Sequence, residues 1–110
     1  MKLLTEEIKA KLPKLYAQDG KGGKAIVHAK FFMPTGSWSW YVLEGDIIKN
    51  DDGSEDALFF GLVDGFEKEL GYFNLKELEA VKGPLGLPIE RDLHWQPKAL
   101  EEIMPELFKD

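Results

Sequence analysis

The sequence contains no cysteine, which excludes disulfide bonds and zinc sites built on thiolates. It also has no apolar run near the roughly 18 residues that a membrane-spanning helix needs. The segment Met1–Glu7 lacks the long apolar stretch of a secretory signal. We therefore expect a cytoplasmic protein that has no membrane-spanning helix and is not secreted.

The sequence has no excess of basic residues. It holds 14 Lys and Arg against 20 Asp and Glu, a net charge of −6. Affinity for duplex DNA comes largely from phosphate neutralisation, so we expect no direct duplex binding, and a protein partner fits the charge better. The alternative is a local basic patch formed by lysines in the first quarter of the chain, namely Lys9, Lys11, Lys14, Lys21 and Lys24.

Common catalytic motifs are missing as well. The chain has no Gly-x-Ser-x-Gly elbow and no phosphate-binding loop, and 20–23 (Gly-Lys-Gly-Gly) lacks the spacing and the hydroxyl of such a loop. These absences favour a protein that is not an enzyme and that has no cofactor. A hydrolase with paired carboxylates remains open, because two acids need only converge in space.

The patterns that are present predict short helices around a set of strands. Thr5 followed by acids is typical of a helix start, and Pro13 ends or bends that helix. Asn74 with Glu77 resembles a capping box for a short second helix. A third helix is expected from about Pro97. Four strand-like runs lie between the first two helices: Ala25–Met33, Ser37–Leu43, Asp56–Val63 and Phe66–Phe73.

With 110 residues, the chain is expected to be one domain, 1–110. Short links favour antiparallel neighbours, so we predict a two-layer α+β domain: an antiparallel sheet of about four strands with N- and C-terminal helices. The continuous apolar run Asp56–Val63 indicates burial on both faces, and Gly71 is a candidate bulge. The expected core residues are Val27, Phe31, Leu58, Phe60, Leu62, Leu70 and Leu75.

Six motifs occur in one order along the chain: Lys30–Pro34, Trp38–Tyr41, Glu44–Asp46, Leu58–Gly65, Glu69–Phe73 and Leu85–Leu93. Together they resemble a small bacterial domain family of unknown function, domain of unknown function 2958, over nearly the whole chain. The resemblance implies a gene carried on plasmids, phages or integrative elements, often near antirestriction and conjugation genes. It implies no established chemistry, but it suggests a counter-defence accessory role.

The candidate site is Leu85–Trp95, an apolar loop that runs into closely spaced charges. Its apolar side chains need burial, so we expect Arg91 to pair with a carboxylate and to hold the loop on the sheet edge. If the segment is extended, Glu90, Asp92 and His94 point to one side and could bind a divalent ion as a hydrolase or nuclease does. The alternative is that these charges only fix the loop.

Aromatic residues supply the other candidate surface. On alternation, Trp38 and Trp40 share one face of a strand and Tyr41 takes the other. They either pack in the core or, with Trp95, form an exposed anchor for a partner. The leading hypothesis is a non-enzymatic protein-interaction module whose contact residues are Trp38, Trp40, Tyr41, Glu90, Arg91, Asp92, His94 and Trp95.

Two further features have alternative interpretations. The acids Glu44, Asp46, Asp51, Asp52, Glu55 and Asp56 form either a solvated turn or a surface that imitates nucleic-acid phosphates. His28 is expected to be a half-buried sheet residue and not a ligand. Partner identity and oligomeric state do not follow from the sequence.

Overall fold

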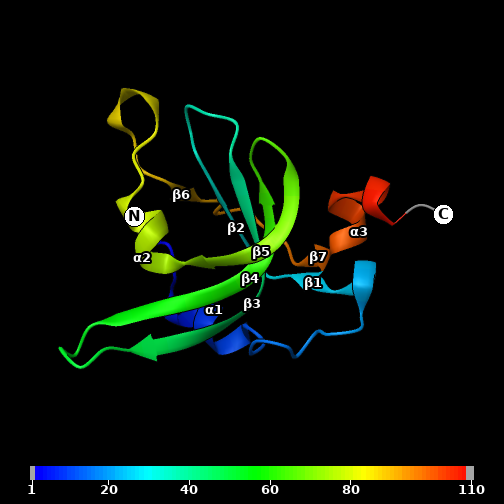
Figure 1. The fold of residues 1–110 in the computed structure, drawn as a ribbon, viewed down its shortest axis with the longest axis horizontal. Coiled ribbons are helices and arrows are strands. Elements are labelled where there is room, and N and C mark those ends of the chain that lie inside the picture. The colour runs from blue at the N-terminus through cyan, green and yellow to red at the C-terminus, as the bar shows by residue number, and fades with distance from the viewer. Residues whose placement is uncertain (1, 109–110) are drawn as a thin grey trace.

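A five-stranded antiparallel sheet forms the centre of the protein in the computed structural model, which describes residues 2–108 (Figure 1). Its strands follow the order β5 (Lys68–Asn74), β4 (Glu55–Asp64), β3 (Ser39–Lys49), β2 (Ala29–Phe32) and β6 (Glu90–Arg91). A two-stranded antiparallel sheet pairs β1 (Ile26–Val27) with β7 (Lys98–Ala99). The predicted α+β class is confirmed, whereas the predicted four strands are wrong, because Glu90–Arg91 adds a fifth strand beside β2.

The helices lie near both ends of the chain as predicted, but all of them are short. They are α1 (Glu6–Lys11), α2 (Leu75–Ala80) and α3 (Leu100–Ile103), with 3-10 turns η1 (Gly22–Lys24), η2 (Pro84–Gly86) and η3 (Pro105–Leu107). The Thr5 hydroxyl accepts a hydrogen bond from the Ile8 amide at 3.2 Å, so Thr5 caps α1 as predicted. Pro105 stops α3, because proline has no N–H to continue the helix.

The start of α2 is capped from a neighbouring strand. Asn74 makes no side-chain cap, so the predicted capping box is wrong. Instead the Asp56 carboxylate on β4 accepts hydrogen bonds from the Lys76 amide at 3.0 Å and the Asn74 side chain at 3.3 Å. Partial burial alone would raise the pKa of Asp56, but these bonds and the one from the Ala57 amide lower it. The carboxylate therefore stabilises the N-terminus of α2.

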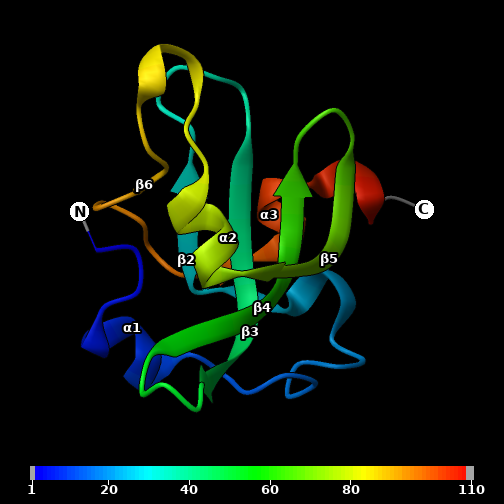
Figure 2. The ribbon, with the colours of Figure 1, turned by 60° about the vertical axis from the view of Figure 1, so that its left-hand side comes forward.

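Apolar side chains pack on both faces of the sheet, and this corrects the expected two layers. On β4, Phe59 belongs to one cluster and Leu62 to the other, which confirms burial on both faces of that strand. The N-terminal segment and α2 cover the first cluster through Leu3, Leu4 and Leu78, and Figure 2 shows α2 and α3 on opposite sides of the sheet. The second cluster comprises Ala25, Val27, Leu43, Leu62, Leu100 and Met104.

The individual core predictions have mixed outcomes. Val27, Phe31 and Leu62 are fully buried, as predicted. Leu58, Phe60 and Leu75 are only partly buried. Leu70 is 47% exposed because it lies on the outer strand β5, where one flank has no neighbouring strand.

The sheet bulges at Val42–Glu44 and not at Gly71, whose ladder with Gly61 is regular. Beyond the bulge, β3 continues to Lys49, and Glu44 is 3% exposed. Its carboxylate accepts the amides of Tyr16 at 2.8 Å and Gln18 at 2.7 Å. Glu44 therefore stabilises the segment after α1 and is not part of a solvated or phosphate-like surface.

Candidate functional site

The predicted site segment lies along the β2 edge of the main sheet. Arg91 is opposite Phe31 in the ladder, and the Asp92 amide donates to the Lys30 carbonyl at 2.9 Å. This confirms that the loop ends on the sheet edge. The expected burial of its apolar side chains holds only for Ile89, since Leu85 is 90% exposed and the loop turns back there with a positive φ of 66°.

Arg91 links this edge to the N-terminal segment. Its guanidinium donates to the main-chain oxygen of Lys2 and, at 3.4 Å, to that of Leu3. Leu3 and Leu4 are each 3% exposed in the first cluster. The main-chain contacts of Arg91 thus keep the residues before α1 beside β6, and these two elements form facing walls.

After β6 the chain turns sharply. The Asp92 carboxylate accepts the His94 amide at 2.9 Å, and the Trp95 indole N–H donates to the Val27 carbonyl at 3.0 Å. The Trp95 ring lies 5.8 Å from that of Tyr41, and the Lys98 ammonium is 4.7 Å from its centroid. These contacts fix the indole in the second cluster with one flank beside the turn.

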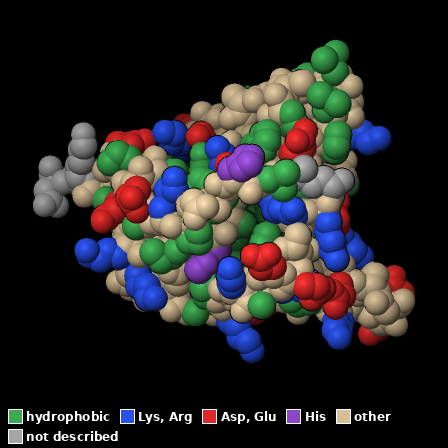
Figure 3. Space-filling model, turned by 180° about the vertical axis from the view of Figure 1, so that it is seen from behind, with side chains coloured by type: hydrophobic (Ala, Val, Ile, Leu, Met, Phe, Trp, Pro, Cys, Tyr) green, Lys and Arg blue, Asp and Glu red, His purple; other side chains and the backbone are tan. Residues whose placement is uncertain are grey.

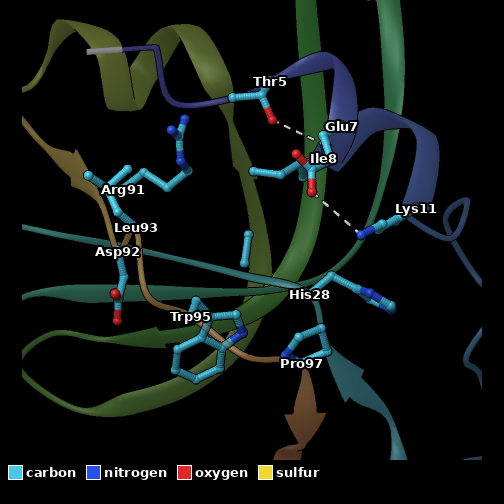
Figure 4. Close-up of a pocket in the computed structure, with 11 residues that line it drawn as sticks. Thr5, Glu7, Ile8, Lys11, His28, Arg91, Asp92, Leu93, Trp95 and Pro97 are labelled. Carbon is cyan, nitrogen blue, oxygen red and sulfur yellow. Dashed lines mark hydrogen bonds and ion pairs between the residues drawn. The ribbon is translucent and has the colours of Figure 1, made fainter.

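The two walls enclose a pocket of about 280 Å³. Figure 4 shows α1 on one side and the 91–95 segment on the other, with His28 and Pro97 closing one end. Both histidines of the chain lie on this face of the molecule, with apolar and charged side chains between them (Figure 3). The lining consists of Thr5, Glu7, Ile8, Lys11, His28, Ala29, Arg91, Asp92, Leu93, Trp95 and Pro97.

The charges of the pocket are of both signs. Lys11 pairs with Glu7 at 3.6 Å, and both side chains are largely exposed. Burial lowers the pKa of His28, and the positive charge of Lys21 lowers it further, so the imidazole is neutral at pH 7. The pocket therefore offers apolar side chains, a neutral imidazole and charged groups of both signs.

A family profile described as Protein of unknown function (DUF2958) matches residues 3–102. The chain belongs to this family. No curated protein and no solved structure matches the chain. Within the described residues of this DUF2958 protein, no helix is long and apolar enough to cross a membrane.

The metal hypothesis for this DUF2958 protein needs Glu90, Asp92 and His94 on one side of an extended segment. Only Glu90–Arg91 is a strand, and the turn at Asp92 ends the alternation on which the hypothesis depends. Among residues 2–108, no three His, Cys, Asp or Glu side chains gather closely enough to hold a metal ion. The geometry thus gives the hydrolase alternative no ligand set.

The other predicted aromatic residues divide between the faces of the sheet. Trp38 and Trp40 share one face, with ring centroids 6.0 Å apart, while Tyr41 lies on the other, as the alternation predicts. Trp40 is 7% exposed and therefore packs in the core. Trp38 is partly buried and borders a separate cleft near the β4–β5 hairpin.

Sequence reasoning did not identify the contribution of α1 to the pocket. The sequence patterns indicate helix residues for Thr5 and Ile8, a possible basic patch for Lys11 and a sheet residue for His28, but none of them indicates a pocket. The apolar residues Leu4, Ile8 and Leu12 recur at helical spacing and indicate a buried face, but not which edge of the sheet that face meets. The contact depends on Arg91 and the N-terminal main chain, which are separated by almost the whole sequence.

Proposed function

We propose that this protein is a non-enzymatic interaction module that binds a protein partner through the pocket between α1 and the 91–95 segment. The observation that carries the proposal is one open pocket whose lining combines apolar side chains with charged and polar ones. Apolar pockets with a few polar groups are the common form of binding sites, the apolar part giving affinity and the polar part orientation.

The pocket suits an apolar side chain of the partner. Ile8, Trp95 and Pro97 supply apolar surface, and Leu93 is 62% exposed at the rim. Burying Leu93 against a partner would remove that surface from water. Lys11 and Glu7 at the rim can then hydrogen-bond the partner's main chain beside the buried side chain.

We extend the proposal to a biological setting. The resemblance carried by the six sequence motifs implies genes on mobile elements, so we propose that the module is encoded on such an element and has a counter-defence role against the host. The acidic net charge of −6 is compatible with a protein partner that has basic or amphipathic surface. The partner is accordingly sought in the host cell.

Affinity capture with two leucine variants tests the proposal. Leu93→Arg alters the pocket rim, and Leu85→Arg is its matched control, because Leu85 is 90% exposed and outside the pocket. We expect a protein that is retained by wild type and by Leu85→Arg but lost with Leu93→Arg. The captured partner, once purified, should bind wild type and Leu85→Arg more tightly than Leu93→Arg. Restriction and CRISPR interference should be measured in the same host cells.

Two results would contradict the proposal. Capture of the same proteins by all three forms would remove the pocket from the contact. A divalent ion bound at one equivalent and lost on His94→Ala would favour a metal-dependent hydrolase instead.

A further inference from the structure

A second cleft, of about 300 Å³, lies beside the hairpin that joins β4 to β5. Its lining is formed by Trp38, Val63, Phe66, Glu67 and Glu69. Phe66 is 95% exposed, so the folded chain gains almost nothing from burying this ring. The hairpin is near the outer strand β5, at the edge of the sheet opposite to β6.

Two aromatic rings stand at nearly a right angle in this cleft. The Phe66 and Trp38 centroids are 5.3 Å apart, with 80° between the ring planes. The Trp38 side chain is held by its contacts, because it packs against the first cluster and its ring lies against Gly65. A Cβ on Gly65 would come within 2.4 Å of that ring, so a larger residue at this position would displace the Trp38 side chain. The cleft thus has one rigid aromatic wall and one exposed aromatic wall.

Two carboxylates complete the lining. Glu67 and Glu69 are exposed, and Glu69 is opposite Val63 in the β4–β5 ladder. The lysine between them, Lys68, pairs instead with Glu106 at 2.9 Å. Within the part of the chain that the structure describes, no Lys or Arg forms an ion pair with Glu67 or Glu69. Among residues 2–108, therefore, no cation is paired with their negative charge.

We propose that this cleft binds a cationic side chain, a lysine or arginine of a basic protein segment. The π faces of Trp and Phe attract cations, and the negatively charged carboxylates attract cations as well. An anionic ligand would be repelled by Glu67 and Glu69. A purely apolar ligand would use the rings but would have to desolvate the carboxylates without a partner for them. The site is independent of the α1 pocket, and either can fail without the other.

The test uses a fluorescein-labelled peptide of alternating lysine and alanine, titrated with the full chain at low ionic strength and followed by fluorescence polarisation. A matched peptide with norleucine for lysine keeps the apolar stem and removes the charge. We expect salt-sensitive binding of the lysine peptide only, together with a shift of the Trp38 indole signal in NMR spectra. That shift locates the binding in the cleft.

Substitutions in the cleft separate the two contributions. Phe66→Leu keeps an apolar side chain and removes the π face, and we expect about two- to fivefold weaker binding. Glu67→Gln with Glu69→Gln should weaken binding about fivefold. The matched control is Glu77→Gln with Glu79→Gln, which makes the same charge change on exposed residues of α2, beyond the other end of β5. All these residues are exposed, so folding should be unaffected.

Three results would overturn the proposal. The first is equal weakening by the α2 control pair, which would reduce the binding to general attraction by net charge. The second is equal binding of the norleucine peptide, which would make the cleft an apolar site. The third is no detectable binding of the lysine peptide, with no change of the Trp38 signal, at millimolar protein.

Discussion

At the scale of single residues, Phe59 joins three strands of the sheet. Its side chain is fully buried, and its ring lies 5.9 Å from that of Phe31 on β2 and 5.6 Å from that of Phe73 on β5. Removing the ring leaves a cavity that the surrounding strands cannot close. We expect Phe59→Ala to lower the free energy of unfolding by about 3–5 kcal/mol, measured by urea denaturation.

Phe60 is the control for this prediction, because it is the adjacent residue on the opposite face. It is only partly buried beside Tyr72. Phe60→Ala should therefore cost about 1–2 kcal/mol, less than Phe59→Ala. A larger loss for Phe60 would mean that the second cluster contributes more to stability than the first.

His28 should make stability depend on pH. Burial lowers its pKa, and Lys21 lowers it further, so the unfolded chain binds a proton at higher pH than the folded chain. Its contribution to stability is constant above the ordinary histidine pKa of about 6.5 and is lost as the pH falls below that value. His28→Gln should flatten the stability profile just below pH 6.5, measured by thermal unfolding across pH.

NMR titration gives the direct check on His28. Its ring signals should titrate below the ordinary histidine value. The same ring in the urea-unfolded chain is the reference, because unfolding removes the burial that lowers its pKa. If His28 titrates at or above the ordinary value, the buried environment described for it is wrong.

At the scale of elements, the segment between α1 and η1 depends on two buried polar side chains. Glu44 accepts two amides of this segment, and the Gln18 side chain donates to the carbonyls of Ile26 and Leu43 at 2.9 and 2.8 Å. Gln18 also accepts the Ile26 amide at 2.7 Å. A stretch with little helix or strand is thereby fixed on the second face of the sheet.

Replacing Glu44 with alanine should release this segment. The Tyr16 and Gln18 amides would lose their acceptor, at a cost of about 1–3 kcal/mol. Hydrogen exchange should accelerate at those two amides before it does in β3 or β4. Glu67→Ala is a suitable control, since Glu67 is an exposed carboxylate on the hairpin. Unchanged exchange at residues 16 and 18 would show that the other contacts of the segment, such as those of Gln18 and Asp46, hold it without Glu44.

The elements differ in how far the sequence predicts them. Each of the four predicted runs contains strand, because a repeat of two over many residues leaves a clear signal. The first run is divided at His28 into β1 and β2, which belong to different sheets, and the sequence does not predict this break. β6 and β7 lie outside the predicted runs and have two residues each, too few for any periodicity. The cap of α2 by Asp56 could not be predicted, because its partners come from a different part of the chain.

The same reasoning explains the partial prediction of the site. Arg91, Asp92 and Trp95 were singled out because charges and an aromatic ring follow an apolar loop, and all three line the pocket. Trp40 has two interpretations in the sequence, a core residue or an exposed anchor, and the first cluster buries it as the core interpretation predicts. Which side of a strand reaches solvent depends on the helices that cover each face, and the local pattern does not contain that information.

At the scale of the whole molecule, the two proposed binding surfaces occupy opposite edges of the main sheet. The α1 pocket lies beside β2 and β6, and the cleft lies at the β4–β5 hairpin. The first is apolar with charges of both signs, whereas the second is aromatic and acidic. The two surfaces do not overlap, so both can be occupied at the same time, either by one partner or by two different partners.

The distribution of charge over the molecule argues against binding to duplex DNA. The lysines that could form a basic patch are partly neutralised: Lys9 lies 3.1 Å from Glu6 and 2.8 Å from Glu55, and Lys11 pairs with Glu7. The hydrogen bond to Glu55 is the main cause of the raised pKa of Lys9, so its charge is committed to that pair.

We therefore expect no appreciable shift of duplex DNA in a gel-shift titration at about 0.15 M ionic strength. Binding to DNA phosphates requires lysine or arginine side chains that are not paired with acids. The affinity of such binding falls steeply as the salt concentration rises, so the titration should be repeated at lower salt. Reversal of Lys9, Lys11 and Lys14 to glutamate provides the comparison. Tight, salt-sensitive binding by the wild type that disappears in this variant would show that the first quarter of the chain is a nucleic-acid surface despite its paired acids.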